Sequence, residues 1–421
     1  MNGHPYPNPA QPTGATPGWT PPPSGDSWYP PAGTATGTLP PPAPAPAPAP
    51  ERRRAGRLRM GVAGLLAGAL VGGGAGAGVV ALTSGGGSGG SGTAATAQSV
   101  VITDPENATA VTAAAAKASP SVVTVYVTSG SGSGSGSGVV LSDDGYVLTN
   151  NHVVTLDGST GDAAIQVRTS DGTLYDATVV GTDPTSDLAV IRLQGAGGLT
   201  AATFADSDDV QVGDLAVAIG APLGLSDTVT DGIVSATDRA VATGSTRDDA
   251  TVIDALQTDA AINPGNSGGA LVDASGEVIG INTAIASVAS GAPGSASQSG
   301  SIGVGFAIPS NTAQRIAEEI IDTGSATHAV LGVNAQTAGG TASSEVGTGA
   351  QVVQVQPGGA AAEAGLQAGD VVTAVGDRAV TTSTELTAAI RSSAPGTRVQ
   401  LTVQRDGGTS TVEVTLGSSA D

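Results

Sequence analysis

The chain of 421 residues contains no cysteine and only three histidines. The missing cysteine excludes disulfide bonds, thiol catalysis and metal sites built on thiolates. The histidines lie too far apart in the sequence to indicate a histidine-based metal site. The sequence therefore predicts a protein that uses no metal or other cofactor, with very few side chains able to act as an imidazole base.

Aromatic residues make up only 2% of the chain. Both tryptophans, Trp19 and Trp28, lie in the first 50 residues, where proline, glycine, alanine, serine and threonine dominate. Such a composition favours extended chain and buries little apolar surface. We therefore predict a disordered tail over residues 1–59, followed later in the chain by a folded region whose core is aliphatic.

Basic residues are scarce beyond this tail. Residues 1–59 carry five arginines and two acidic residues, whereas the rest of the chain carries ten basic and 34 acidic residues. An acidic surface of this kind repels the phosphate backbone of nucleic acids. Nucleic-acid binding is therefore not expected.

Residues 60–82 contain no charged or polar side chain and follow an arginine-rich segment. Their length matches the roughly 20 residues that span a bilayer core, and the arginines favour a cytoplasmic N-terminus. We therefore predict a single-pass membrane helix at 60–82 and domains outside the cytoplasm. The alternative is a cleaved signal peptide, whose apolar region is usually shorter and nearer the N-terminus.

Small residues line one face of this predicted helix at four-residue spacing: Gly64, Gly68, Gly72 and Gly76. Glycines in this pattern let a second helix approach closely, so a homo-oligomer is possible, although the Gly/Ala-rich composition explains the pattern equally well. Residues 83–102 are rich in glycine and serine and are expected to be a flexible linker.

Short runs of β-branched and aliphatic residues, separated by Gly, Asp and Asn, follow from residue 103. The runs are 122–127, 139–141, 146–149, 165–168, 188–193, 215–219, 252–256, 278–283 and 303–308. Many short strands with turns between them favour antiparallel barrels or sandwiches. The Gly/Ser repeat before Val139 is expected to be a floppy surface loop. Helices are expected at Glu106–Ala118 and at Ser310–Thr323, the second with Ser310 or Asn311 as its N-cap.

Ser267 lies in the segment "NPGNSGGALV" and is the candidate nucleophile. The pattern Gly-x-Ser-Gly-Gly alone is weak, because the linker repeats it at Gly86–Gly90. The nucleophile elbow of an α/β-hydrolase requires a helix after the serine, whereas the sequence here predicts strand, turn and strand. The remaining arrangement has histidine first, acid second and serine last on a β-barrel.

His152 is the only histidine between residues 5 and 327, so it must be the base if Ser267 reacts by the serine–histidine route. Its alternative is a purely structural role. Asp187 precedes the apolar run "LAVIRL", where a carboxylate is able to be buried and to hold the imidazole in one tautomer. Asp183, nearby, is expected to be a solvated turn residue.

The segments "SPSVVTVYV", "GSGVVLSDDGYVLTNNHVV", "DLAVIRL", "QTDAAINPGNSGGALVDASGEVIGINTAI" and "GVGFAIPSN" resemble the HtrA (Deg) family of trypsin-like serine proteases. The resemblance implies a chymotrypsin-like double β-barrel domain, placed at 103–325. It implies His152 as base, Asp187 as orienting acid and Ser267 as nucleophile. It also implies an oxyanion hole at Gly265, Asn266 and Ser267, with the backbone N–H groups of Gly265 and Ser267 as donors.

Residues 326–418 resemble a PDZ domain, an α+β fold, with the turn "GLQAGD" at 365–370 as the most specific feature. In such domains an extended peptide adds a strand to a sheet edge, and backbone amides bind its terminal carboxylate. The resemblance places this site at Leu331, Gly332 and Val333, with a helix from Ser383 as the opposite wall. The alternative is an α+β domain that binds no peptide.

Together these features predict a mainly β, membrane-anchored serine endopeptidase outside the cytoplasm. It would degrade misfolded or damaged proteins in protein quality control and the stress response, and C-terminal peptides would regulate it through the PDZ domain. An aliphatic preference at the S1 pocket is implied by resemblance. The family's trimers pack through aromatic residues near the start of the protease domain, where this chain offers only Tyr126, so its oligomeric state stays open. The alternative function is a protease fold that is inactive at rest and acts as a PDZ-based peptide-binding or chaperone-like protein.

Overall fold

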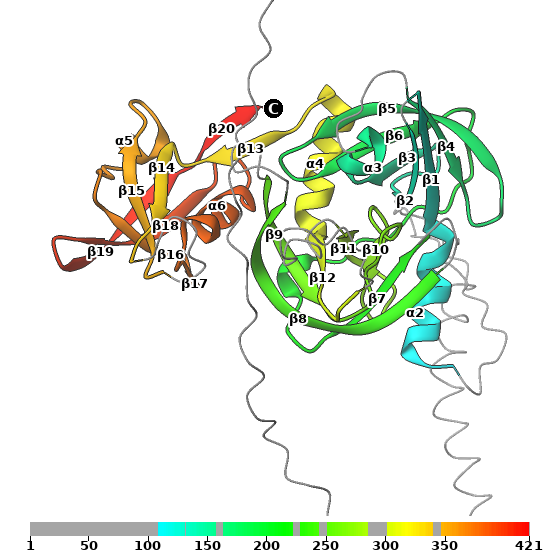
Figure 1. The fold of residues 1–421 in the computed structure, drawn as a ribbon, viewed down its shortest axis with the longest axis horizontal. Coiled ribbons are helices and arrows are strands. Elements are labelled where there is room, and N and C mark those ends of the chain that lie inside the picture. The colour runs from blue at the N-terminus through cyan, green and yellow to red at the C-terminus, as the bar shows by residue number, and fades with distance from the viewer. Residues whose placement is uncertain are drawn as a thin grey trace, which may run out of the picture. The chain divides into compact units, whose positions relative to one another are not determined.

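The computed structural model describes residues 108–130, 132–156, 163–221, 228–243, 251–284, 301–339 and 347–420. All of them belong to one compact unit, residues 95–421 (Figure 1). The predicted tail at 1–59, membrane helix at 60–82 and linker at 83–102 lie outside the described residues. Within the described part of the chain, no helix is long and apolar enough to cross a membrane.

Six antiparallel strands close the first barrel in the order β1-β2-β3-β6-β5-β4. They are β1 (Val122–Ser129), β2 (Gly132–Val140), β3 (Tyr146–Thr149), β4 (Ala164–Arg168), β5 (Leu174–Asp183) and β6 (Leu188–Leu193). Val125, Val147, Val167 and Ile191 are fully buried inside it. Branched aliphatic side chains suit this interior because they pack well on a pleated surface.

The second barrel has the order β10-β11-β12-β9-β8-β7. Its strands are β7 (Leu215–Gly220), β8 (Thr228–Thr243), β9 (Thr251–Thr258), β10 (Ala270–Val272), β11 (Val278–Thr283) and β12 (Gly305–Pro309). The two closed barrels confirm the predicted mainly β, chymotrypsin-like architecture. Strands β5 and β8 had no counterpart among the predicted runs, whereas β10 and β11 are the strand, turn and strand predicted after Ser267.

The two barrels share one core with the helix that follows the second barrel. Leu148 and Val190 of the first barrel, Ile219 and Ile281 of the second, and Ile316 of α4 (Ser310–Thr323) belong to one buried cluster. The shorter helices are α2 (Ala110–Ala118), α3 (Asn151–Thr155) and the 3-10 turns Ser119–Ser121 and Ser207–Asp209. The seam between the barrels is therefore a packed interface, on which the site residues lie.

The prediction of a floppy loop for the Gly/Ser repeat is wrong, because the repeat forms most of β2. Every residue from Gly132 to Val139 pairs with β1. The glycines have a packing reason: a Cβ at Gly136 would lie 2.7 Å from Val153 of α3, and one at Gly138 would lie 2.6 Å from Val147. Composition suggested a floppy surface loop, whereas close approach of neighbouring side chains requires glycine in this strand.

The bounds predicted for α4 are confirmed, but its predicted N-cap is wrong. Pro309 is the N-cap residue, and no side chain caps the helix. The Ser310 hydroxyl instead donates to the Ala205 carbonyl, and the Asn311 amide donates to Asp206. These two side chains fasten the helix to the segment before Ser207–Asp209.

The C-terminal residues form an α+β domain. The strands of its main sheet are β14 (Val333–Thr337), β15 (Ala350–Val355), β16 (Val371–Val375), β17 (Arg378–Ala379), β18 (Arg398–Arg405) and β19 (Gly408–Thr415). A separate pair joins β13 (Thr327–Val330) to β20 (Gly417–Ala420), and the helices are α5 (Ala360–Glu363) and α6 (Ser383–Arg391). A capping box between Thr382 and Glu385 begins α6.

The turn "GLQAGD" is built around Asp370, whose side chain is only 1% exposed. Its carboxylate accepts the Gln367 N–H at 2.8 Å and two Arg405 guanidinium bonds at 2.6 and 2.7 Å. The hydrogen bonds from Arg405 hold the pKa of Asp370 below its usual value. Gly365 and Gly369 both have positive φ, which the tight turn requires.

Candidate active site

His152 and Asp187 lie in direct contact on the first barrel. His152 is in α3, immediately after β3, and its Nδ1 lies 2.9 Å from Oδ2 and 3.0 Å from Oδ1 of Asp187. The backbone N–H of His152 also donates to Asp187 Oδ1, at 3.0 Å. The carboxylate is thus placed to fix the tautomer in which Nδ1 carries the proton and Nε2 is free to act as a base.

Neighbouring residues hold Asp187 in place by hydrogen bonds to its backbone and to its side chain. Its φ of 55° is left-handed, and the side-chain amide of Asn150 donates to its carbonyl at 2.7 Å. From the second barrel, the Thr283 hydroxyl donates to Oδ2 at 3.2 Å. The sequence did not single out Asn150 or Thr283, because neither residue type is rare enough in this chain to stand out.

Asp183, predicted to be a solvated turn residue, is fully buried, and that prediction is wrong. Its Oδ1 lies 2.9 Å from Nε2 of His328 and accepts the backbone N–H groups of Thr185 and Ser186. These bonds shape the turn that leads to Asp187. The partner lies 145 positions along the chain, so no local pattern reveals it.

Ser267 lies in the turn between β9 and β10 and is 3% exposed. Its Oγ accepts the backbone N–H of Ala284 at 3.1 Å, while the preceding Thr283 contacts Asp187. Two consecutive residues at the end of β11 therefore contact the acid and the serine, through the Thr283 hydroxyl and the Ala284 N–H. Among the hydrogen bonds of the described residues, none joins His152 Nε2 to Ser267 Oγ.

The turn before Ser267 presents two backbone N–H groups. Gly265 has a φ of 101°, and the Asn266 N–H donates to Asn263 O at 2.9 Å. No hydrogen bond within the described residues uses the N–H of Gly265 or of Ser267. These two groups are therefore available to a developing oxyanion. Asn266, whose own N–H is used, supports the turn through its side-chain bond to Ala261 O.

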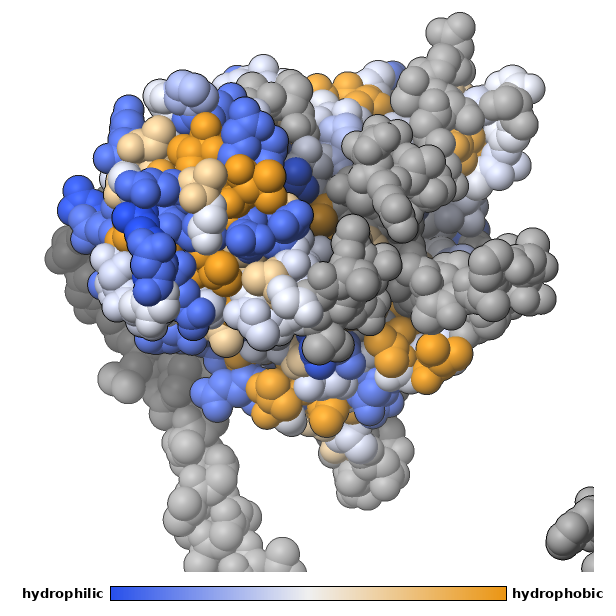
Figure 2. Space-filling view, turned by 60° about the vertical axis from the view of Figure 1, so that its left-hand side comes forward, coloured by the Kyte–Doolittle hydropathy of each residue, from blue (hydrophilic) through white to orange (hydrophobic). Residues whose placement is uncertain are grey.

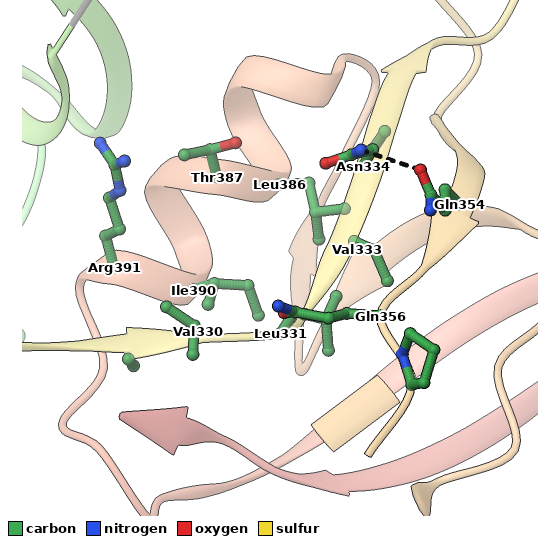
Figure 3. Close-up of a pocket in the computed structure, with 14 residues that line it drawn as sticks. Val330, Leu331, Val333, Asn334, Gln354, Gln356, Leu386, Thr387, Ile390 and Arg391 are labelled. Carbon is green, nitrogen blue, oxygen red and sulfur yellow. Dashed lines mark hydrogen bonds between the residues drawn. The ribbon is translucent and has the colours of Figure 1, made fainter. Parts of the chain in front are cut away.

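A groove of about 520 Å³ lies between β14 and α6 of the C-terminal domain. The predicted residues Leu331, Gly332 and Val333 line one side, and Leu386 and Ile390 of α6 line the other (Figure 3). Strand β14 is at the edge of its sheet, where a further strand is able to pair. Figure 2 shows apolar residues gathered on this domain among hydrophilic ones.

Polar side chains stand beside these apolar residues. The amide of Asn334 donates to Gln354 at 3.4 Å across β14 and β15, as Figure 3 shows. Gly332, which also lines the groove, has a φ of 76°, and its carbonyl accepts the Gln356 N–H. No group of three or more potential metal ligands is present among the described residues.

Comparison with known proteins matches both parts of the chain. Residues 136–281 match the model of the trypsin-like peptidase domain, and residues 327–416 match the model of the PDZ domain. Serine protease PepD of Mycobacterium tuberculosis is 50% identical over 287 residues, which cover 67% of this chain and 60% of that protein. The periplasmic pH-dependent serine endoprotease DegQ of Escherichia coli is 42% identical over 285 residues, covering 67% and 58%. The chain thus spans about three fifths of these curated relatives.

Among solved structures, the HtrA-type protease AlgW with a tripeptide is 37% identical, with a TM-score of 0.54. The match covers 73% of this chain and 97% of that one, so it includes both domains. The shared fold, order of domains and identity lead to one assignment: the chain belongs to the HtrA family of trypsin-like serine proteases with a C-terminal PDZ domain.

Proposed function

We propose that the chain is a serine endopeptidase in which His152, Asp187 and Ser267 form the catalytic triad. The observation that carries this proposal is the bidentate contact of Asp187 with Nδ1 of His152, next to a buried serine with two unused backbone N–H groups. Ser267 Oγ attacks the scissile carbonyl while His152 Nε2 takes its proton. The N–H groups of Gly265 and Ser267 stabilise the oxyanion. His152 then protonates the leaving amine, and water hydrolyses the acyl-enzyme.

The location and substrates of the enzyme form a second part of the proposal. The apolar segment 60–82 would anchor the protease domain (103–325) and the PDZ domain (326–418) outside the cytoplasm. The periplasmic location in the name of DegQ is consistent with this placement. We propose that the substrates are unfolded or damaged proteins, which offer the extended chain that a protease cleft requires.

Peptide binding at the PDZ groove is proposed to regulate cleavage. AlgW, the related protein, has been solved with a tripeptide and with a decapeptide. In this chain, α6 lines the groove and also carries Arg391, which donates to the Val252 carbonyl of β9 at 3.4 Å. His328, at the start of the PDZ domain, contacts Asp183 four residues before Asp187. A peptide bound in the groove would therefore act on the protease domain through the Arg391 bond or through the contact between His328 and Asp183.

The missing bond between His152 Nε2 and Ser267 Oγ favours a second candidate function. In that case the fold is inactive at rest and the chain works mainly by binding peptides. A fluorophosphonate probe, which reacts only with an activated serine, distinguishes the two candidates. The probe is applied to the full-length protein with and without a peptide that binds the PDZ groove.

Labelling of the wild type that disappears in Ser267→Ala supports the endopeptidase, and cleavage of an unfolded protein should disappear with it. Stronger labelling with the peptide supports regulation through the PDZ domain. A folded wild type that binds the peptide, yet is labelled under neither condition, would instead support the peptide-binding function.

A further inference from the structure

Ser137 lies in the Gly/Ser repeat of β2, yet it is fully buried at the seam between the barrels. Its hydroxyl donates to the Gly265 carbonyl at 2.7 Å and accepts the Ala221 N–H at 2.8 Å. Ser137 belongs to the first barrel, whereas both partners belong to the second. One hydroxyl therefore fastens the turn that carries the oxyanion donors to the opposite barrel.

The backbone of Ser137 adds two contacts of the same kind. Its N–H donates to the Ser267 carbonyl at 2.8 Å, and its carbonyl accepts the Thr149 hydroxyl at 2.6 Å. Thr149 ends β3, three residues before His152. This single residue thus bonds to both sides of the nucleophile turn and to the strand that leads to the base.

The position of the Gly265 carbonyl bears directly on the oxyanion hole. It belongs to the peptide unit between the two that carry the N–H groups of Gly265 and Ser267. Displacement of that middle unit would move the Cα atoms of Gly265 and Asn266, to which the two units that carry the donors are joined. Because Gly265 has no Cβ and a φ of 101°, the local backbone resists such a displacement only weakly.

From this arrangement we propose that Ser137 is a positioning residue for the reaction. Its hydroxyl holds the Gly265–Asn266 peptide unit in the orientation that directs both N–H groups at the oxyanion. Its hydroxyl bonds to Gly265 and Ala221 and not to His152, so we assign its effect to this turn. The inference rests on the proposed serine-protease function and deepens it, because it assigns the preorganisation of the oxyanion hole to a residue outside the triad.

The space around Ser137 is fitted to its size. A Cβ at Gly220 would lie 2.9 Å from its Oγ, and a Cβ at Gly269 would lie 3.1 Å from its Cβ. A Cβ at Gly268 would overlap its carbonyl oxygen. The neighbouring glycines therefore make room for this side chain and its bonds.

The test compares Ser137→Ala with Ser133→Ala in the full-length protein. Ser133 is exposed and lies in the same strand and repeat, so it is the matched control. We expect Ser137→Ala to lower kcat about 10- to 100-fold, less than the loss of a whole oxyanion donor, with KM changed less than about threefold. Ser133→Ala should retain the wild-type values. Circular dichroism gives the folded fraction of each variant, and kcat is calculated per folded enzyme.

A second readout separates positioning from simple support of the fold. A peptide boronate mimics the tetrahedral oxyanion, and its affinity should fall in Ser137→Ala by the same factor as kcat/KM. The binding of a product peptide should not change. The dependence of kcat/KM on pH should also keep its wild-type shape, because the Ser137 hydroxyl bonds to Gly265 and Ala221 and not to a titrating side chain.

If Ser137→Ala does not fold, Ser137→Cys carries the test. The thiol occupies nearly the same space but is only a weak donor, so kcat of Ser137→Cys should be at least tenfold below that of the wild type. A kcat equal to that of the wild type in either variant would overturn the inference while the proposed function stands. A wild type that neither cleaves substrate nor reacts with the fluorophosphonate would overturn the proposed function as well.

Discussion

At the scale of the residue, Asp187 combines an unusual backbone conformation with a proposed role in the triad. Its left-handed φ of 55° is one that asparagine also adopts readily. Asp187→Asn should therefore keep the fold, but its amide N–H would face Nδ1 of His152 and favour the wrong tautomer. We expect kcat to fall by about 10⁴, as such a change costs in a serine-protease triad.

The measurement is kcat/KM for Asp187→Asn, with the melting temperature as control for the fold. Asp176→Asn, an acidic residue on the exterior of β5, is the matched control and should retain full activity. An Asp187→Asn variant within tenfold of the wild type would contradict the role given to this carboxylate.

Rarity decided which site residues were predictable from sequence. His152 was found because the folded region has almost no other histidine, and Asp187 because it precedes a strongly apolar strand. Serine and threonine, the types of Ser137 and Thr283, are common in this chain, and the ten asparagines do not single out Asn150. The importance of these three residues comes from hydrogen bonds to positions between 37 and 128 residues away, which no local pattern encodes.

At the scale of the element, β2 shows how close packing replaces side chains with glycine. Gly136→Ala would place a methyl group 2.7 Å from Val153, in the helix that carries His152. We expect a loss of about 1–3 kcal/mol in the free energy of unfolding, because overpacking forces neighbours to move, and a lower kcat if α3 shifts.

Gly132→Ala in the same strand is the control, because a Cβ there meets nothing within 4 Å. Chemical denaturation of both variants gives the comparison. Equal stability of the two variants would show that α3 adapts freely and that glycine is not required at position 136.

The turn at Asp370 allows a prediction on stability and pH. Its pKa is lowered in the folded state, chiefly by hydrogen bonds from Arg405. The resulting stabilisation is present above the ordinary aspartate pKa of about 3.9 and is lost as the pH falls through the lower, folded-state value. Asp370→Asn should thus cost about 2 kcal/mol at pH 7, and the difference from wild type should shrink progressively below about pH 4.

Glu413→Gln is the matched control within the same domain. Glu413 pairs with Arg398 at 3.3 Å, but both side chains are well exposed, so this pair should contribute less than about 1 kcal/mol. Denaturant titrations of both variants at pH 7 and pH 3 test the difference. A deficit for Asp370→Asn that stays the same at both pH values would contradict the assignment.

At the scale of the whole molecule, the sequence was sufficient for the kinds of domain but not for the contacts between them. Short aliphatic runs separated by turns predicted antiparallel barrels or sandwiches, and the resemblance to the HtrA family and to PDZ domains implied the double barrel and the C-terminal fold. The bonds that cross from one domain to the other join a side chain of one domain to a side chain or a backbone group of the other. Arg378 of β17 binds Asp254 of β9 at 2.7 and 2.8 Å and the Asp238 carbonyl at 2.8 Å.

This contact supplies the last prediction, because Asp254 is largely buried. Burial raises the pKa of its carboxyl above the ordinary value, and the bonds from Arg378 only partly oppose that rise. A raised folded-state pKa means that the carboxylate costs stability at neutral pH, and that this cost disappears as the pH falls through the raised value. Arg378→Ala leaves the buried charge unpaired, so the free energy of unfolding should fall by about 3 kcal/mol at pH 7 and by clearly less in acid, where neutral Asp254 needs no counter-ion.

Thermal unfolding of the full-length protein at pH 7 and pH 5 measures this loss of stability in Arg378→Ala. Adding Asp254→Asn to Arg378→Ala removes the titrating group, so the difference between the two pH values should vanish in the double variant. A loss in Arg378→Ala that is equal at both pH values would mean that the guanidinium acts through packing rather than through the charge of Asp254.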